Sequence, residues 1–146
     1  MEITETTATY PMNLVGSRTG ETYIGEFKFK CLLTPIEKIE ADKQYRKLLG
    51  ENMIMASDTA KSLAFALSQL QFRILEAPPF WDSRVLGGSH IMDDNIIIEA
   101  FNKSVEAEEQ FMEAVQKKAK EIEERLQKAI KSKQIEKEEE VESPND

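Results

Sequence analysis

The chain has one cysteine, Cys31, and one histidine, His90, and these are the first residues to consider for nucleophilic catalysis. A catalytic serine, cysteine or lysine needs an oriented base within hydrogen-bond reach. Cys31 alternates with Phe27 and Phe29 on the apolar side of a predicted strand, where a thiol is usually a small buried hydrophobic group. The sequence also lacks a G-x-S-x-G nucleophile elbow. We therefore predict no catalytic residues and interpret the protein as a non-enzyme.

His90, Asp93 and Asp94 form the grouping that most resembles a metal site or an acid–base pair. A zinc site takes histidine and cysteine ligands in numbers that this chain lacks. An aspartate just before a helix more simply caps the first amides and places negative charge at the positive end of the helix dipole. A magnesium site made of carboxylates alone stays open as an alternative. We predict no metal and no cofactor.

Glycines and basic residues give no phosphate-binding pattern. Gly87 and Gly88 are not followed by a lysine and a hydroxyl residue, as a phosphate-binding loop would require. Lys43, Arg46 and Lys47 make a small basic face, but Glu37, Glu40 and Asp42 interleave with it. This pattern predicts a solvated surface of ion pairs.

The charge balance disfavours several classes of partner. The chain has 27 acidic and 19 basic residues, for a net charge of -8. A field of this sign repels phosphate backbones and anionic lipid headgroups, so we predict no nucleic-acid and no membrane partner.

A lone cysteine suits a reducing compartment, and the start of the chain lacks the features of a signal peptide. We expect a soluble intracellular protein.

The N-terminal third predicts a β-hairpin followed by a helix. Residues 1–8 are expected to be a flexible arm, and the hairpin strands are expected over residues 10–15 and 22–33, with Gly25 marking a bulge. Thr34, Pro35 and Glu37 form a capping box that should start a largely solvated helix ending near Leu49.

Two further helices follow. Ser57 or Asp58 should cap a strongly apolar helix that continues to about Leu75. A long helix should begin near Asp93 or Asp94 and continue to Lys131. Along it, residues recur at alternating spacings of three and four, the a/d seam of a coiled coil. This seam consists of Ile98, Phe101, Val105, Glu108, Met112, Val115, Ala119, Ile122, Leu126 and Ala129.

The predicted fold class is mainly α with a small N-terminal β-hairpin (α+β), with three helices of which the last is long and coiled-coil-like. We expect a flexible arm at residues 1–8, a single helical domain with the hairpin at residues 9–131, and an acidic disordered tail at residues 132–146, into which the long helix passes as a frayed end.

Two groups of apolar residues are candidate partner contacts. Phe80 and Trp81 follow two prolines at the corner between the apolar helix and the long helix, where aromatic rings either plug the core or form an exposed anchor. The core plug is the favoured interpretation. The seam should pack within the chain from Ile98 to about Val115. The positions beyond are equally consistent with an internal contact and a partner contact. The candidate contacts on the long helix are Val115, Ala119, Ile122 and Leu126.

The order of these segments resembles small virion-associated or tail-assembly proteins of tailed bacteriophages. The resemblance covers residues 27–112 and lies in "LLTPIEKIEADKQYRKLLG", "PPFW" and "IMDDNIIIEAF", followed by a helix rich in lysine and glutamate. It implies an acidic, non-enzymatic factor, either a tail-assembly chaperone or a minor virion component.

We therefore expect a protein that acts through protein–protein contacts in the host cytoplasm or in the virion. Its partner would be another phage structural or assembly protein, or a second copy bound through the long C-terminal helix. The alternative is an acidic inhibitor that blocks a basic host protein by charge mimicry, a role suggested by the net charge and the acidic end of the chain.

Overall fold

The computed structural model describes residues 1–4, 6–82 and 86–142. It is an α+β fold with three helices, the last of them long, as the sequence predicted. The chain divides into two compact units, Met1–Phe111 and Met112–Asp146. The elements in chain order are β1 (Glu2–Thr4), β2 (Thr7–Val15), β3 (Thr22–Lys30), α1 (Pro35–Leu49), the 3-10 turn η1 (Met53–Met55), α2 (Asp58–Arg73), β4 (Ile74–Glu76) and α3 (Asp94–Glu142).

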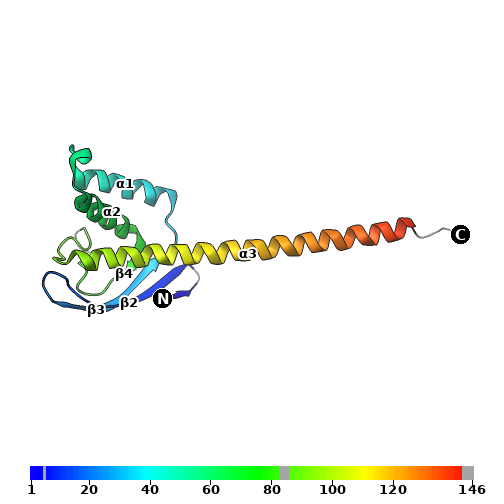
Figure 1. The fold of residues 1–146 in the computed structure, drawn as a ribbon, viewed down its shortest axis with the longest axis horizontal. Coiled ribbons are helices and arrows are strands. Elements are labelled where there is room, and N and C mark those ends of the chain that lie inside the picture. Colours follow the sequence, from blue (N-terminus) through cyan, green and yellow to red (C-terminus); the bar gives the residue numbers. More distant parts are fainter. Residues whose placement is uncertain (5, 83–85, 143–146) are drawn as a thin grey trace. The chain divides into compact units, whose positions relative to one another are not determined.

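The strands form one antiparallel sheet in the order β1-β2-β3-β4 (Figure 1). The expected hairpin is its centre, where β2 and β3 pair in register from Thr7 opposite Lys30 to Val15 opposite Thr22. Alternation along these strands turns Met12, Phe27 and Phe29 toward the core. Gly25 pairs regularly with Met12, so the predicted bulge at Gly25 is wrong.

Two short edge strands were not predicted. β1 lies within the segment expected to be a flexible arm, where Glu2–Thr4 pairs antiparallel with the start of β2. β4 takes up Ile74–Glu76, so α2 ends at Arg73 and not at Leu75. β-branched residues favour extended backbone, and the unpaired edges of β2 and β3 supply the hydrogen-bond partners.

Helices α1 and α2 begin at their predicted caps. The Thr34 hydroxyl accepts a hydrogen bond from the Glu37 amide, and the Glu37 carboxylate accepts one from the Thr34 amide, which completes the capping box. The Ser57 hydroxyl accepts a hydrogen bond from the Ala60 amide at the start of α2. Helix α1 packs on α2 and buries only Ala41, in agreement with its thin apolar stripe.

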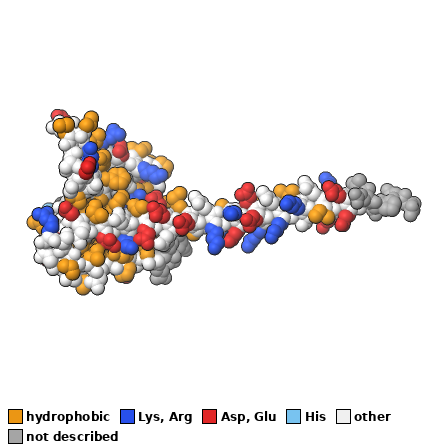
Figure 2. Space-filling model, viewed as in Figure 1, with side chains coloured by type: hydrophobic (Ala, Val, Ile, Leu, Met, Phe, Trp, Pro, Cys, Tyr) orange, Lys and Arg blue, Asp and Glu red, His pale blue; other side chains and the backbone are white. Residues whose placement is uncertain are grey.

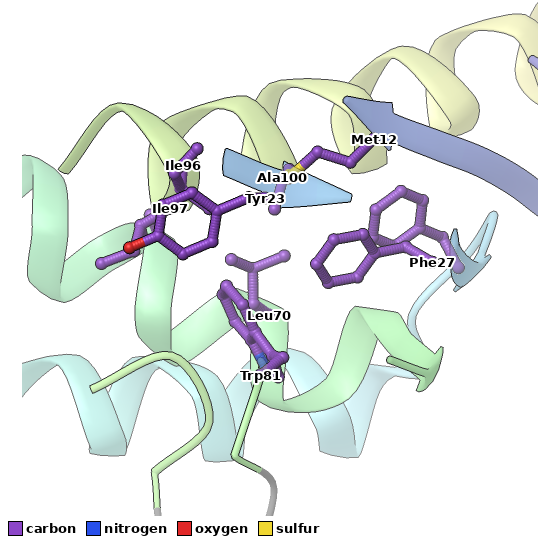
Figure 3. Packing of buried hydrophobic residues seen from close by; sticks show 10 residues of the cluster. Met12, Tyr23, Phe27, Leu70, Trp81, Ile96, Ile97 and Ala100 are labelled. Carbon is purple, nitrogen blue, oxygen red and sulfur yellow. The ribbon is translucent and has the colours of Figure 1, made fainter. Parts of the chain in front are cut away.

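The core lies between the sheet and the helices α2 and α3 (Figure 3). Phe27 from β3, Leu70 from α2 and Ile96 from α3 are fully buried there. Trp81 enters the same core from the corner after α2, and its ring meets the ring of Phe27 edge-on with centroids 5.5 Å apart. Burial of these large apolar side chains from the sheet, α2 and α3 is the main source of stability in this unit.

Helix α3 continues to Glu142, so the described part of the expected disordered tail at residues 132–146 is helical. Lysine and glutamate have high helix propensity, and the three-residue spacing of Lys133 and Glu136 places opposite charges one turn apart on an exposed helix. Among the described residues, no helix combines the length and hydrophobicity that a bilayer span requires.

The corner glycines give a test of the core. A Cβ on Gly88 would lie 2.5 Å from Cη2 of Trp81, and Gly88 has a φ of +84°, whereas Gly50 has a φ of +72° with nothing within 4 Å. We predict that Gly50→Ala costs about 1–2 kcal/mol of unfolding free energy through backbone strain. Gly88→Ala should cost about 1–3 kcal/mol more because it overpacks the indole. Urea unfolding measures both values, and equal losses would contradict tight packing around Trp81.

Candidate functional site

Cys31 and His90 are not brought together as a nucleophile and a base. Cys31 is fully buried in a small apolar cluster with Ala8, Ala107 and Phe111, as the alternating pattern predicted. Burial raises the pKa of its thiol, and the negative charge of Glu108 adds to the effect. Since the thiolate is the reactive form, this environment disfavours reaction at Cys31. His90 is exposed in the turn that precedes α3.

Asp93 is buried completely, and its carboxylate is surrounded by donors from the turn between β2 and β3. Oδ1 accepts hydrogen bonds from the amides of Arg18 at 2.7 Å and Thr19 at 2.8 Å. Oδ2 accepts hydrogen bonds from the Thr19 hydroxyl at 2.6 Å and the Tyr23 hydroxyl at 2.8 Å. The sequence suggested a helix cap, but these bonds join the carboxylate to a turn about 75 residues earlier in the chain.

This arrangement fixes the charge on Asp93. Burial opposes ionisation, but the hydrogen bonds from Thr19, Tyr23 and Arg18 outweigh it and lower the pKa from 3.8 to about 2. The same contact with Asp93, together with burial, raises the pKa of Tyr23 to about 12. A general base works best with a pKa near the working pH and within reach of a substrate. Asp93 has neither property, and we assign it the structural role of attaching the β2–β3 turn to the start of α3.

Gly16 and Asn95 complete this attachment. A Cβ on Gly16 would lie 2.1 Å from Oδ2 of Asp93, so only glycine leaves room for the carboxylate. The Asn95 side chain accepts a hydrogen bond from the Ser17 amide at 3.0 Å and donates one to the Val15 carbonyl at 3.1 Å. The predicted hairpin strands at residues 10–15 and 22–33 implied a turn between them, but nothing local in the sequence indicated the partner of that turn.

Several other ionisable groups form ion pairs. Within the described ranges, no three histidine, cysteine, aspartate or glutamate side chains are placed to hold a metal ion. The basic face of α1 is an ion-pair surface, with Lys43 3.4 Å from Glu40 and Arg46 3.0 Å from Asp42.

Glu108, the one charged residue in the seam, pairs with Arg73 of α2 at 3.3 Å. Arg73 is buried, and it also donates a hydrogen bond to Gln69. No pattern in the sequence indicated this pair. Leaving either charge without its partner would be costly, so the pair specifies how this part of α3 faces α2.

The candidate contact residues at the corner are core residues. Trp81 is 5% exposed, so the assignment of Trp81 as a partner contact is wrong and the core plug is the correct interpretation. Phe80 is partly buried against the same core, where its ring meets Tyr23 and Phe27 edge-on. The Pro-Pro segment fits there because Gly25 lacks a side chain, and a Cβ on Gly25 would lie 2.3 Å from Pro78.

The seam on α3 has two different environments. Ile98 and Phe101 pack against the core, but the most buried face of α3 is a neighbouring one, formed by Ile97, Ala100, Ser104 and Ala107. From Met112 onward the apolar seam residues are exposed: Val115 by 50%, Ile122 by 53% and Leu126 by 59%. Met112 and Val115 were expected to pack within the chain, and their exposure corrects that expectation.

We call Met112, Val115, Ala119, Ile122, Leu126 and Ala129 the exposed seam. All six are exposed on a helix whose other residues in this part are mostly charged or polar (Figure 2). Four of them, Val115, Ala119, Ile122 and Leu126, are the contacts that the sequence proposed on this helix. The exposed seam is the candidate functional site.

The Asp93 attachment gives a prediction about acid stability. An aspartate with a pKa lowered from 3.8 to about 2 stabilises the fold fully above its ordinary pKa, and this stabilisation is lost as the pH falls through 2. At neutral pH, Asp93→Asn should lower the melting temperature by about 5–10 °C. The gap between the variant and the unmodified protein should shrink as the pH falls toward 2.

Asp94→Asn is the matched control, since it removes the same charge one residue later without touching the turn. It should change the melting temperature much less at every pH. A gap for Asp93→Asn that stays constant from neutral pH to pH 2 would show that the ionised carboxylate is not what stabilises the turn.

Comparison with protein-family models, with curated proteins and with solved structures finds no match, so a function proposed for the chain rests on its own residues.

Proposed function

We propose that this chain is a non-enzymatic assembly or structural protein that works by binding another helix along its exposed seam. The single observation that carries the proposal is the exposure of Val115, Ile122 and Leu126 on one face of α3. Covering the exposed half of each side chain would contribute on the order of 1 kcal/mol per residue. A regular row of such side chains at coiled-coil spacing is typical of a helix that binds a second helix.

The biological setting that we propose is the assembly of a tailed bacteriophage, with the protein acting as a tail-assembly chaperone or a minor virion component. This setting is the one suggested by the order of segments in residues 27–112, and the exposed seam supplies the contact surface that such a role needs. In this setting the protein would act in the host cytoplasm or in the virion.

The alternative, charge mimicry against a basic host protein, uses a different part of the chain. It depends on the net charge of -8 and on the acidic residues after Ser132, and it does not need the exposed seam. In the described part of that segment, Lys133 and Lys137 interrupt the acids, which weakens a purely acidic surface. Deleting residues 132–146 separates the two functions. Mimicry predicts loss of binding and of its salt dependence, whereas seam binding predicts that binding is largely kept.

Leu126→Glu tests the seam directly, because it puts a charge where the proposed contact buries an apolar side chain. The matched control is Gln127→Glu, which adds the same charge one residue later, off the seam. In affinity purification from the cells that produce the protein, Leu126→Glu should lose the co-purifying partner at least tenfold, since burying an unpaired charge costs well over 1.4 kcal/mol. Gln127→Glu should keep it.

Equal recovery of the co-purifying chain with Leu126→Glu and Gln127→Glu, whether that chain is a different protein or an untagged second copy, would refute the proposed site. Far-ultraviolet circular dichroism should show unchanged helix content in both variants, so that loss of binding is not loss of the helix.

A further inference from the structure

We propose that the partner on the exposed seam is a second copy of this chain, bound parallel and in register. This inference rests on the proposed function, because it names the occupant of the same surface. It is carried by the charges that flank the seam in the stretch from Met112 to Ile130.

The heptad positions follow from the seam itself. Met112, Ala119 and Leu126 occupy the a positions, and Val115, Ile122 and Ala129 occupy the d positions. The flanking g positions are then Lys118 and Arg125, and the flanking e positions are Gln116, Glu123 and Ile130. All of these residues are exposed in the single chain.

A parallel arrangement pairs these flanks favourably. In parallel coiled coils, a g residue faces the e residue five positions later on the neighbouring helix. Lys118 therefore faces Glu123 of the next copy, which is an attractive pair. Arg125 faces Ile130, where its aliphatic stem can lie over an apolar side chain.

An antiparallel arrangement of the same seam brings like charges together. In an antiparallel pair, each a position packs against a d position of the other helix. Ala119 then lies against Ile122 of the other copy, and Met112 lies against Ala129. In that register the g positions face each other, so Lys118 meets Arg125. Like charges at such positions oppose association, and the flanks therefore select the parallel orientation.

The core positions further indicate more than two strands. Leucine at a with isoleucine at d shifts the preference from dimers toward trimers and tetramers. Leu126 lies at a, and Val115 and Ile122 lie at d. Ile130 at an e position widens the apolar face in the same direction.

Charge reversal on purified full-length protein tests the inference, with sedimentation equilibrium over micromolar to millimolar chain concentration as the measurement. The unmodified protein should approach three or four times the monomer mass. Lys118→Glu and Glu123→Lys should each weaken association about tenfold, because several exposed attractive pairs become repulsive at once. The double variant Lys118→Glu/Glu123→Lys restores opposite charges and should recover the association.

Lys120→Glu is the matched control, since it reverses a charge on the same helix away from the seam and should leave the mass curve unchanged. The sign of the Lys118→Glu effect reports the orientation. An antiparallel bundle would be strengthened, because the carboxylate introduced by this substitution would then face Arg125, and that result would overturn the proposal. A stable dimer would contradict the strand number inferred from Leu126, Val115 and Ile122.

The same data separate this inference from the proposed function. A monomeric mass at all concentrations overturns self-association. If Leu126→Glu nevertheless loses a co-purifying protein that Gln127→Glu keeps, the exposed seam binds a different chain and the proposed function stands. If neither result is found, both proposals fail.

Discussion

The burial of apolar side chains along α3 differs between the unit that ends at Phe111 and the residues that follow. In that unit, Ile96, Ile97 and Ala100 are buried in the core, and Ala107 is buried in the cluster around Cys31. In the following unit, Val115, Ile122 and Leu126, which continue the heptad spacing of Ile98 and Phe101, are half exposed. Regularly spaced apolar residues on a long exposed helix indicate a contact with another molecule. The functional proposal follows from this difference in burial along one helix.

Two polar contacts fix the rotation of α3 about its own axis in the unit that ends at Phe111. Asp93 and Asn95 join its start to the β2–β3 turn, and Glu108 pairs with Arg73 near the end of this unit. Because both contacts are directional, they allow one rotation of the helix about its axis. Trp81 lies in the same core, where the absence of side chains at Gly87 and Gly88 leaves room for its indole. The corner after α2 is therefore part of the scaffold, and the candidate contact surface is confined to the exposed seam.

The sequence predicted the elements that depend on local or periodic signals. The capping box at Thr34, the alternation through Phe27 and Phe29, and the start of α3 near Asp94 all came from such signals, whereas its continuation from Lys131 to Glu142 was not predicted. The short strands β1 and β4 were missed because their pairing depends on neighbours supplied by the sheet. The Asp93 attachment and the Arg73–Glu108 pair join residues far apart in the chain, and a single sequence carries no signal for either contact. The exposed seam was predictable because coiled-coil spacing is periodic, but the residue where burial ends was not.

Hydrogen–deuterium exchange as a function of chain concentration tests the central claim most directly. Helical amides that a second chain covers open less often and exchange more slowly than those of an uncovered helix. Self-association along the exposed seam predicts that protection of residues 112–130 rises with concentration, while protection of residues 94–111 stays high throughout. Fast exchange of residues 112–130 at every concentration would contradict it.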